Sequence, residues 1–256
     1  ALQNTTSGYH NTGIGVFSGV TNTTGHDNTS LGLCSLHANT TGDNNVAIGA
    51  CALDSNTTAN NNTAVGTSAL LANTTGTSNV AVGSLSLLAN TTGGDNNSFG
   101  NQSLCDNTTG EFNTAMGQAA LKSNTTGTKN VAIGGNSLLS NTTTSCSVAI
   151  GYQAMQLKTN GDNVAVGSQA LYASGDGYQN TAIGHRNMCD HTSGYKNAFV
   201  GSSSAIRITS GHSNTGIGAG AGRTISTGAK NVSIGGESGL VLTTGEENIA
   251  VGQNST

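Results

Sequence analysis

The sequence has no proline and no tryptophan, and only 8% of its 256 residues are charged. Average usage of about 5% would give a chain of this length roughly 13 prolines. Proline cannot donate the backbone N–H that an inner strand needs, so its absence suits a structure in which nearly every strand is an inner one. With a formal net charge of −4 the chain has no basic surface, and we expect no nucleic-acid partner.

Long hydrophobic segments are missing too. No apolar run reaches the roughly 18 residues of a transmembrane helix, so the sequence predicts no direct membrane span. The stretch after Ala1 does not have the pattern of a signal peptide. Few large apolar residues can indicate disorder, but a strict internal repeat argues against it.

A 17-residue unit recurs along the chain, and Asn62 to Ser78 (NTAVGTSALLANTTGTS) is one copy. We number the unit from the first residue of its core, N-x-A-[VI]-G. The core begins at Asn11, Asn28, Asn45, Asn62, Asn79, Asn96, Asn113, Asn130, Ser147, Asn163, Asn180, Asn197, Asn214, Asn231 and Asn248. Every step is 17 residues except the one from Ser147 to Asn163, which is 16. A short fixed period of this kind is typical of solenoids.

The columns of the repeat predict its local structure. Position 4 is apolar in every copy, position 3 is almost always Ala, Ser or Gly, and position 5 is always Gly. This alternation predicts a short strand at positions 2 to 4, and the Ala-Leu or Ser-Leu pair at positions 8 and 9 predicts a second strand around positions 7 to 10. The expected fold is all-β, a parallel β-solenoid (β-roll) of about fifteen 17-residue coils. We expect the small residues at positions 3 and 8 to form flat faces on the outside of the coil.

One elongated repeat domain is expected over residues 1–256. An irregular coil is expected near 142–162, where Ser147 replaces the asparagine and one residue is lost. From about residue 205 the large apolar residue moves from position 9 to position 12, which we interpret as an altered coil whose second strand has slid. Both ends cut through a unit, which indicates an excerpt of a longer protein or a subunit that stacks end to end.

Two columns of asparagine stand out. Stacked coils would align the position-1 side chains, whose amides can then bond along the axis; the alternative is that each only favours a turn. The candidate ladder comprises Asn28, Asn45, Asn62, Asn79, Asn96, Asn113 and Asn130. At position 12 an Asn-Thr-Thr run has the N-glycosylation acceptor pattern, or else simply makes a good turn. The candidate acceptors are Asn22, Asn39, Asn56, Asn73, Asn90, Asn107, Asn124 and Asn141.

The remaining candidate chemistry is sparse. Cys34 and Cys51 share position 7 of adjacent coils, so their Cα atoms are expected within disulfide range, and we predict that they can be bridged in an oxidising environment. Tyr178 and Tyr195 share position 16 and form either a surface ladder or a sugar-binding platform. Single Ca²⁺ ions at Asp/Asn corners stay open. We predict no catalytic, cofactor-binding or metal-binding residues, because facing carboxylates, C-x-x-C pairs and phosphate-binding glycine motifs are missing.

The run N-[VT]-A-[IV]-G-x-x-[AS]-L resembles the head repeats of trimeric autotransporter adhesins, and equally the repeats of phage and giant-virus tail-fibre proteins. Its clearest copies are NVAIG at 45–49 and 130–134, NTAVG at 62–66, NVAVG at 79–83 and 163–167, and NTAIG at 180–184. The resemblance covers almost the whole chain. It implies a left-handed parallel β-roll that assembles as a homotrimer at a cell surface.

The function expected is that of a non-enzymatic structural fibre or adhesin module, extracellular at a cell or virion surface, which forms a rigid repetitive shaft for attachment. The expected partners are copies of the chain, as a trimer or an end-to-end filament, and a host surface glycan or protein. The alternative is a self-assembling extracellular filament subunit that stacks through uncapped coils. An ice-binding solenoid is less favoured, because the two Thr columns are consecutive and do not share one face. A glycan-cleaving fibre enzyme is less favoured for want of a carboxylate pair.

Overall fold

The computed structural model describes residues 1–157, 160–173 and 175–256. The chain forms two compact units, Ala1–Lys129 and Asn130–Thr256. Both are parallel β-solenoids without a helix in the described residues, which confirms the fold class expected from the repeat. The single domain expected over residues 1–256 stays a prediction.

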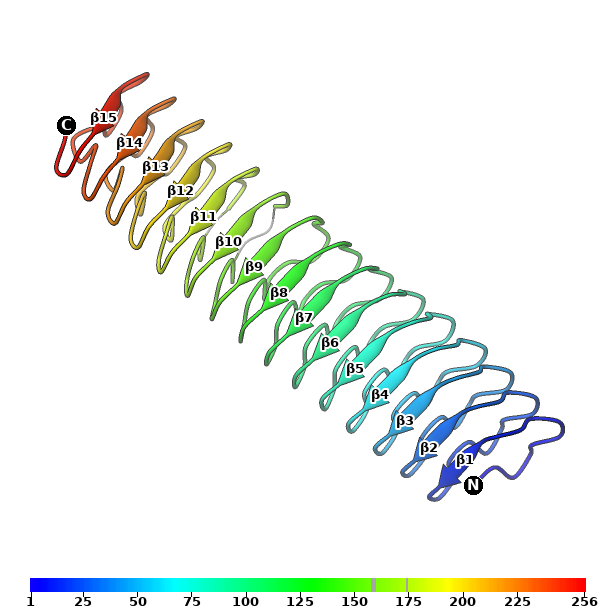
Figure 1. The fold of residues 1–256 in the computed structure, drawn as a ribbon. Helices are drawn as coiled ribbons and strands as arrows, with labels where there is room; N and C mark the ends of the chain where they lie inside the picture. Colours follow the sequence, from blue (N-terminus) through cyan, green and yellow to red (C-terminus); the bar gives the residue numbers. More distant parts are fainter. Residues whose placement is uncertain (158–159, 174) are drawn as a thin grey trace. The chain divides into compact units, whose positions relative to one another are not determined.

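Each coil contributes one strand of three residues, at positions 2 to 4 of the repeat (Figure 1). The first unit contains β1 (Thr12–Ile14), β2 (Thr29–Leu31), β3 (Val46–Ile48), β4 (Thr63–Val65), β5 (Val80–Val82), β6 (Asn97–Phe99) and β7 (Thr114–Met116). The second contains β8 (Val131–Ile133), β9 (Val148–Ile150), β10 (Val164–Val166), β11 (Thr181–Ile183), β12 (Ala198–Val200), β13 (Thr215–Ile217), β14 (Val232–Ile234) and β15 (Ile249–Val251). Within each unit neighbouring strands pair in parallel, with equivalent residues opposite one another, as Val65 is opposite Val82.

The strand register continues through the shortened coil. Val148 lies opposite Val164, and Ile150 lies opposite Val166. The missing residue is therefore taken up in the turns between β9 and β10 and not in the strands. Two residues of the expected irregular coil 142–162, at 158 and 159, lie outside the described residues.

The second strand expected around positions 7 to 10 is wrong, because this segment is a turn in the described coils. Cys51 and Leu53, at positions 7 and 9 of one coil, have φ values of 56° and 51°. These left-handed residues bend the chain, which an extended strand would not do. The turn still bonds to both neighbouring coils, since Cys51 N–H donates to the oxygen of Leu33 (2.8 Å) and Leu53 N–H to that of Ala69 (3.0 Å).

Glycine at position 5 is required by the backbone. Gly66 has φ +137°, and a Cβ atom there would lie 2.6 Å from the carbonyl carbon of Gly83 in the next coil. Residues with side chains rarely adopt this φ, and the next coil leaves no space for one. This explains why every copy of the repeat has glycine at this position.

The core is narrow, and small side chains line it. Ala64 and Ala69, at positions 3 and 8, and Leu70 at position 9 have no exposed surface. Positions 3 and 8 therefore face inward, and the expectation that they form outer faces is wrong. In the regular coils, Ala and Ser oppose a single buried Leu or Met in each layer.

Beyond residue 205 the side chains change, but the backbone path does not. Ala205 and Gly222 stand at position 9, while Ile208 and Ile225 at position 12 are fully buried. Ala205 N–H still donates to the oxygen of Ala221 in the next coil (3.0 Å), the bond that position 9 makes in regular coils. The segment has thus kept its register rather than slid. The volume lost at position 9 is filled by the position-12 side chains and by the buried ring of Phe199, which lies against Gly216 and Gly222.

Candidate functional site

The outer sides of the strands form an apolar surface in each unit. Side chains at positions 2 and 4 point away from the core, and we call this surface the outer strand face. The exposed fraction is 59% for Ile14 and 43% for both Leu31 and Met116. In the second unit the exposed members at position 4 are Ile150, Ile183, Val200, Ile217, Ile234 and Val251.

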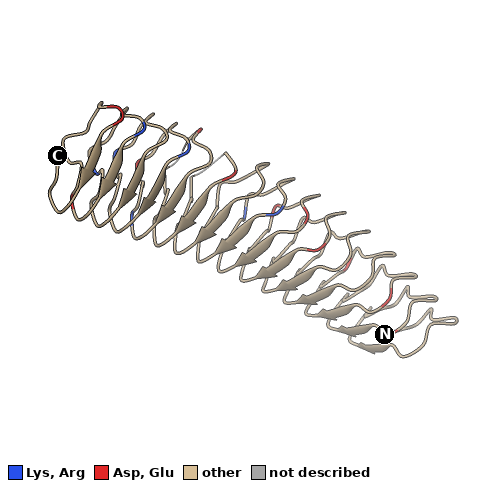
Figure 2. Cartoon of the chain, turned by 45° about the horizontal axis from the view of Figure 1, so that its top comes forward, with Lys and Arg blue, Asp and Glu red and all other residues tan. Residues whose placement is uncertain are grey.

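Charge is absent from this face. None of the strands β1 to β15 contains Asp, Glu, Lys or Arg. Figure 2 shows the charged residues in the turns, away from the strand arrows. Rows of apolar and Thr side chains, repeated at the spacing of parallel strands, make a surface suited to packing against another apolar surface.

The position-1 asparagines are buried and bonded to one another. Asn45 donates to Oδ1 of Asn28 through its backbone N–H (2.9 Å) and through Nδ2 (3.2 Å). Its Nδ2 also donates to the carbonyl oxygen of Ala59 in the same coil (2.9 Å). The buried members in the first unit are Asn28, Asn45, Asn62, Asn79, Asn96 and Asn113, and Asn130 is buried in the second unit. At Ser147 the side chain is too short to continue the ladder, and its buried hydroxyl has no hydrogen-bond partner in the described structure.

The asparagines at position 12 form a second ladder. Nδ2 of Asn56 donates to Oδ1 of Asn39 (2.9 Å) and to the oxygen of Ala59 (3.1 Å). All of the candidate glycosylation acceptors are buried: Asn22, Asn39, Asn56, Asn73, Asn90, Asn107, Asn124 and Asn141. These positions do not fit N-glycosylation of the folded chain, because the nitrogen that would carry the glycan lies inside the coil. The burial corrects that expectation.

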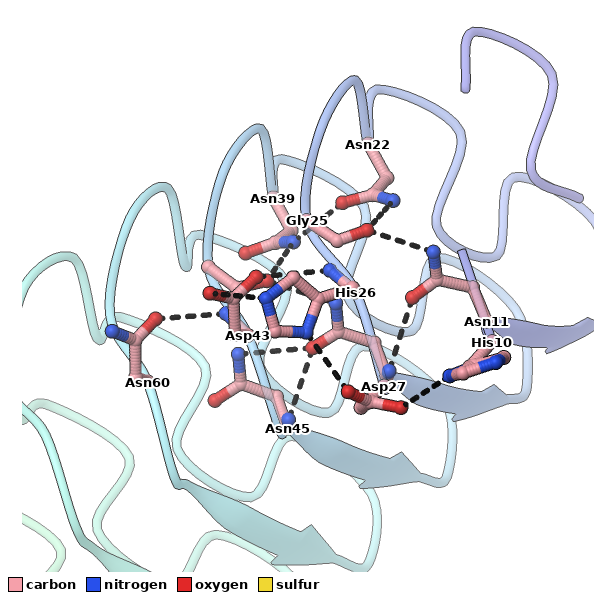
Figure 3. A network of polar contacts seen from close by, with 12 residues as sticks. His10, Asn11, Asn22, Gly25, His26, Asp27, Asn39, Asp43, Asn45 and Asn60 are labelled. Carbon is pink, nitrogen blue, oxygen red and sulfur yellow. Dashed lines mark hydrogen bonds and ion pairs between the residues drawn. The ribbon is translucent and has the colours of Figure 1, made fainter. Parts of the chain in front are cut away.

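Imidazole and carboxylate groups alternate across three coils of the first unit (Figure 3). Asp27 lies 3.1 Å from Nδ1 of His10 and 2.9 Å from Nδ1 of His26, and Nε2 of His26 lies 3.1 Å from Asp43. The His26 ring thus lies between two carboxylates, one beside each ring nitrogen. Tyr9 stacks on the same ring, with centroids 4.7 Å apart. The hydrogen bond from His26 is the largest cause that holds the pKa of Asp27 below its usual value.

Asp43 lies at one of the Asp/Asn corners that were considered as Ca²⁺ sites. Its carboxylate accepts the backbone N–H of His26 (2.9 Å) in addition to the ring contact. Within the described residues there is no group of three or more His, Cys, Asp or Glu side chains that could hold a metal ion.

Cys34 and Cys51 lie in equivalent turns of neighbouring coils, and both are free thiols in this structure. Burial is the largest cause that raises the pKa of Cys51, followed by the charge of Asp54 and by Cys34 itself. The two thiols are thus close enough to influence each other. Their disulfide stays a prediction.

The second ladder and the apolar outer face are what sequence reasoning missed. The signal for the ladder was present, since the position-12 asparagines keep the same strict period as the position-1 column. Period alone cannot tell an asparagine that bonds inside a coil from one exposed in a turn.

No helix in the described residues is long and apolar enough to cross a membrane. When the chain is compared with known proteins, no family model and no curated protein matches it. A functional conclusion must therefore be drawn from the repeat and the surfaces of the two units.

Proposed function

We propose that the chain is a non-enzymatic structural module of a surface fibre or adhesin, extracellular at a cell or virion surface, and that it works as a homo-oligomer. The observation that carries this proposal is the outer strand face, where apolar side chains follow one another from coil to coil without a charged residue. A row of exposed and half-exposed apolar side chains of this kind marks contact sites.

A second copy of the chain is the occupant that fits this face best. Strands of any copy repeat at the same spacing of about 4.8 Å, so two aligned faces can interdigitate over many coils. A closed cyclic assembly covers the face of every copy at once. The resemblance to adhesin head repeats favours a trimer, in which each unit adds length and stiffness to an attachment shaft.

The mass of the chain in solution tests the proposal. Analytical ultracentrifugation over a range of concentrations should give a constant small multiple of the 25.3 kDa chain. The double variant Val65→Lys with Val82→Lys places two charges on the outer strand face of β4 and β5 and should lower the mass to that of a monomer. The matched control is Thr75→Lys with Thr92→Lys, which adds the same charge to exposed turns of the same coils and should leave the mass unchanged.

A wild-type chain that is monomeric throughout, or a Val65/Val82 variant that assembles normally, would sink the homo-oligomer. A mass that grows steadily with concentration would favour the alternative, a filament of subunits stacked end to end.

A further inference from the structure

Three rings form a stack along one corner of the second unit. Tyr178, Tyr195 and His212 occupy position 16 of successive coils. The ring centroids of Tyr178 and Tyr195 are 5.2 Å apart with planes 4° from parallel, and those of Tyr195 and His212 are 4.8 Å apart at 9°. Both faces of the Tyr195 ring are therefore covered, whereas the face of Tyr178 that is turned away from Tyr195 is not covered by the stack.

Tyr178 borders a shallow surface hollow that is largely open to solvent. The lining residues are Thr144, Ser145, Asn160, Gly161, Asp162 and Tyr178. We call this the Tyr178 hollow.

The cause of the hollow can be traced to one column of the repeat. Asp162 N–H donates to the oxygen of Ser145 (3.4 Å), just as Lys196 N–H donates to that of Tyr178 (3.1 Å). Gly161 therefore stands in its coil where Tyr178 stands in the next one, and Ser145 stands there in the coil before. Two small residues thus precede the stack, so no side chain of the column fills the space in front of the Tyr178 ring.

The described lining residues give the hollow a polar rim. Asp162 provides a carboxylate and Asn160 an amide, and Nδ2 of Asn160 lies 3.4 Å from Asp176. Sugar hydroxyls can donate to the carboxylate and can both donate to and accept from the amide. The negative face of an aromatic ring attracts the weakly positive C–H bonds on one side of a pyranose ring.

We propose that the Tyr178 hollow binds a pyranose ring of a saccharide, which stacks on Tyr178 and bonds through its hydroxyls to Asp162 and Asn160. The carboxylate of Asp162 at the rim repels a phosphate or sulfate group and so favours an uncharged sugar. This inference rests on the proposed attachment function and gives it a ligand class, a neutral glycan.

Saturation-transfer NMR on the full chain is the direct test. The probes in solution are methyl glycosides of glucose, galactose, mannose and N-acetylglucosamine. In a second arm the same sugars are immobilised as a surface glycan, and binding of the chain to that surface is measured. At least one probe should receive magnetisation on the protons of one ring face, and either arm that binds supports the site. Tyr178→Ala should weaken binding by about tenfold and Tyr178→Phe should retain it, because the ring face and not the hydroxyl makes the contact. Asp162→Ala should weaken binding without changing the stack.

His212→Ala is the matched control, since it removes a ring at the far end of the same stack and should leave binding unchanged. No transfer to any probe, equal binding by Tyr178→Ala, or displacement of the sugar by adenosine at the same concentration would overturn the proposal. Tyr178 is 44% exposed and lies off the outer strand face, so its variants should keep the assembled mass of the wild type. Failure of glycan binding with an intact oligomer therefore overturns this inference alone.

Discussion

Asn62 and Asn73 donate hydrogen bonds to one shared acceptor, the carbonyl oxygen of Gly76, over 3.0 and 2.9 Å. The two side chains belong to different ladders, one at position 1 and the other at position 12. Because both amides donate to the same oxygen, they link opposite sides of one coil across its interior. The same side chains also form hydrogen bonds to the asparagines of the neighbouring coils. The narrow core thus replaces much of the apolar packing of a larger domain with buried amide bonds.

Asn73→Ala should destabilise the first unit by about 3 kcal/mol, because it leaves Oδ1 of Asn56 without the donor that lies 3.1 Å away and opens a void between coils. Chemical denaturation followed by circular dichroism measures the change. Thr75→Ala, in the exposed part of the same turn, is the control and should stay within about 0.5 kcal/mol of wild type. An unchanged midpoint for Asn73→Ala would show that the second ladder contributes nothing.

Leu70→Ala and Asn73→Ile should partly compensate each other. The coils at Ala205/Ile208 and Gly222/Ile225 already combine a small position 9 with a large position 12 on the same backbone path. Each single substitution should be destabilising, the first by a cavity and the second by overpacking and by loss of the ladder hydrogen bonds of Asn73, which the double variant does not restore. The loss in the double variant should be smaller than the sum of the single losses by at least about 1 kcal/mol. Strict additivity in a double-mutant cycle would contradict the core exchange.

Acidification should loosen the first coils through Asp27. Its folded-state pKa is lowered, chiefly by the hydrogen bond from His26, so the unfolded chain takes up a proton at higher pH than the folded chain does. The stabilising contribution is therefore present above the unfolded pKa of about 3.9 and is lost as pH falls through the lower folded value. Hydrogen exchange at the Asp27 amide, which donates to the oxygen of Tyr9 (3.1 Å), reports the local opening.

The control for this experiment is Asp27→Asn, which should remove the acid-induced loss of protection at that amide after correction for the intrinsic exchange rate. Asp95→Asn changes the same repeat position in a coil without histidine neighbours. This variant should keep the wild-type response to acid at the Asp27 amide. If wild type and Asp27→Asn respond alike to acid, the His10–Asp27–His26 contacts do not stabilise these coils.

Oxidation should join Cys34 to Cys51. The raised pKa of Cys51 means that its reactive thiolate is scarce near neutral pH, so a mild oxidant should work faster at about pH 9 than at pH 7. The bridge should stabilise the chain by about 3 kcal/mol through loop closure. Mass spectrometry after alkylation under denaturing conditions counts the remaining thiols, with Cys34→Ser as the control. The bridge should leave three of the five thiols for alkylation, and alkylation of all five after oxidation at both pH values would refute the pairing.

Part of the architecture was readable from the sequence. Strict recurrence of Asn-x-Ala-Val-Gly and its variants predicted a parallel solenoid, a strand at positions 2 to 4 and an aligned asparagine column. These features could be predicted because equivalent positions of successive coils lie next to one another in an in-register stack. A residue type that fits one coil therefore recurs at the same position of the next. Glycine at position 5, as at Gly66, is constant in the sequence, although its close approach to Gly83 depends on the neighbouring coil.

The direction in which side chains point was decided only by the tertiary structure. Alternation in a strand such as Thr63-Ala64-Val65 defines two faces but does not say which one is inside, and the width of the coil places Ala64 inward and Val65 outward. The same width brings Asn73 into the core, where an amide on the coil axis has partners above, below and across. The sequence by itself determined which residues stack on one another, because that depends on period alone. The backbone path of each coil, which is a property of the tertiary structure, decided which rows point inward. A row that points inward became a buried ladder, and a row that points outward became an exposed apolar face.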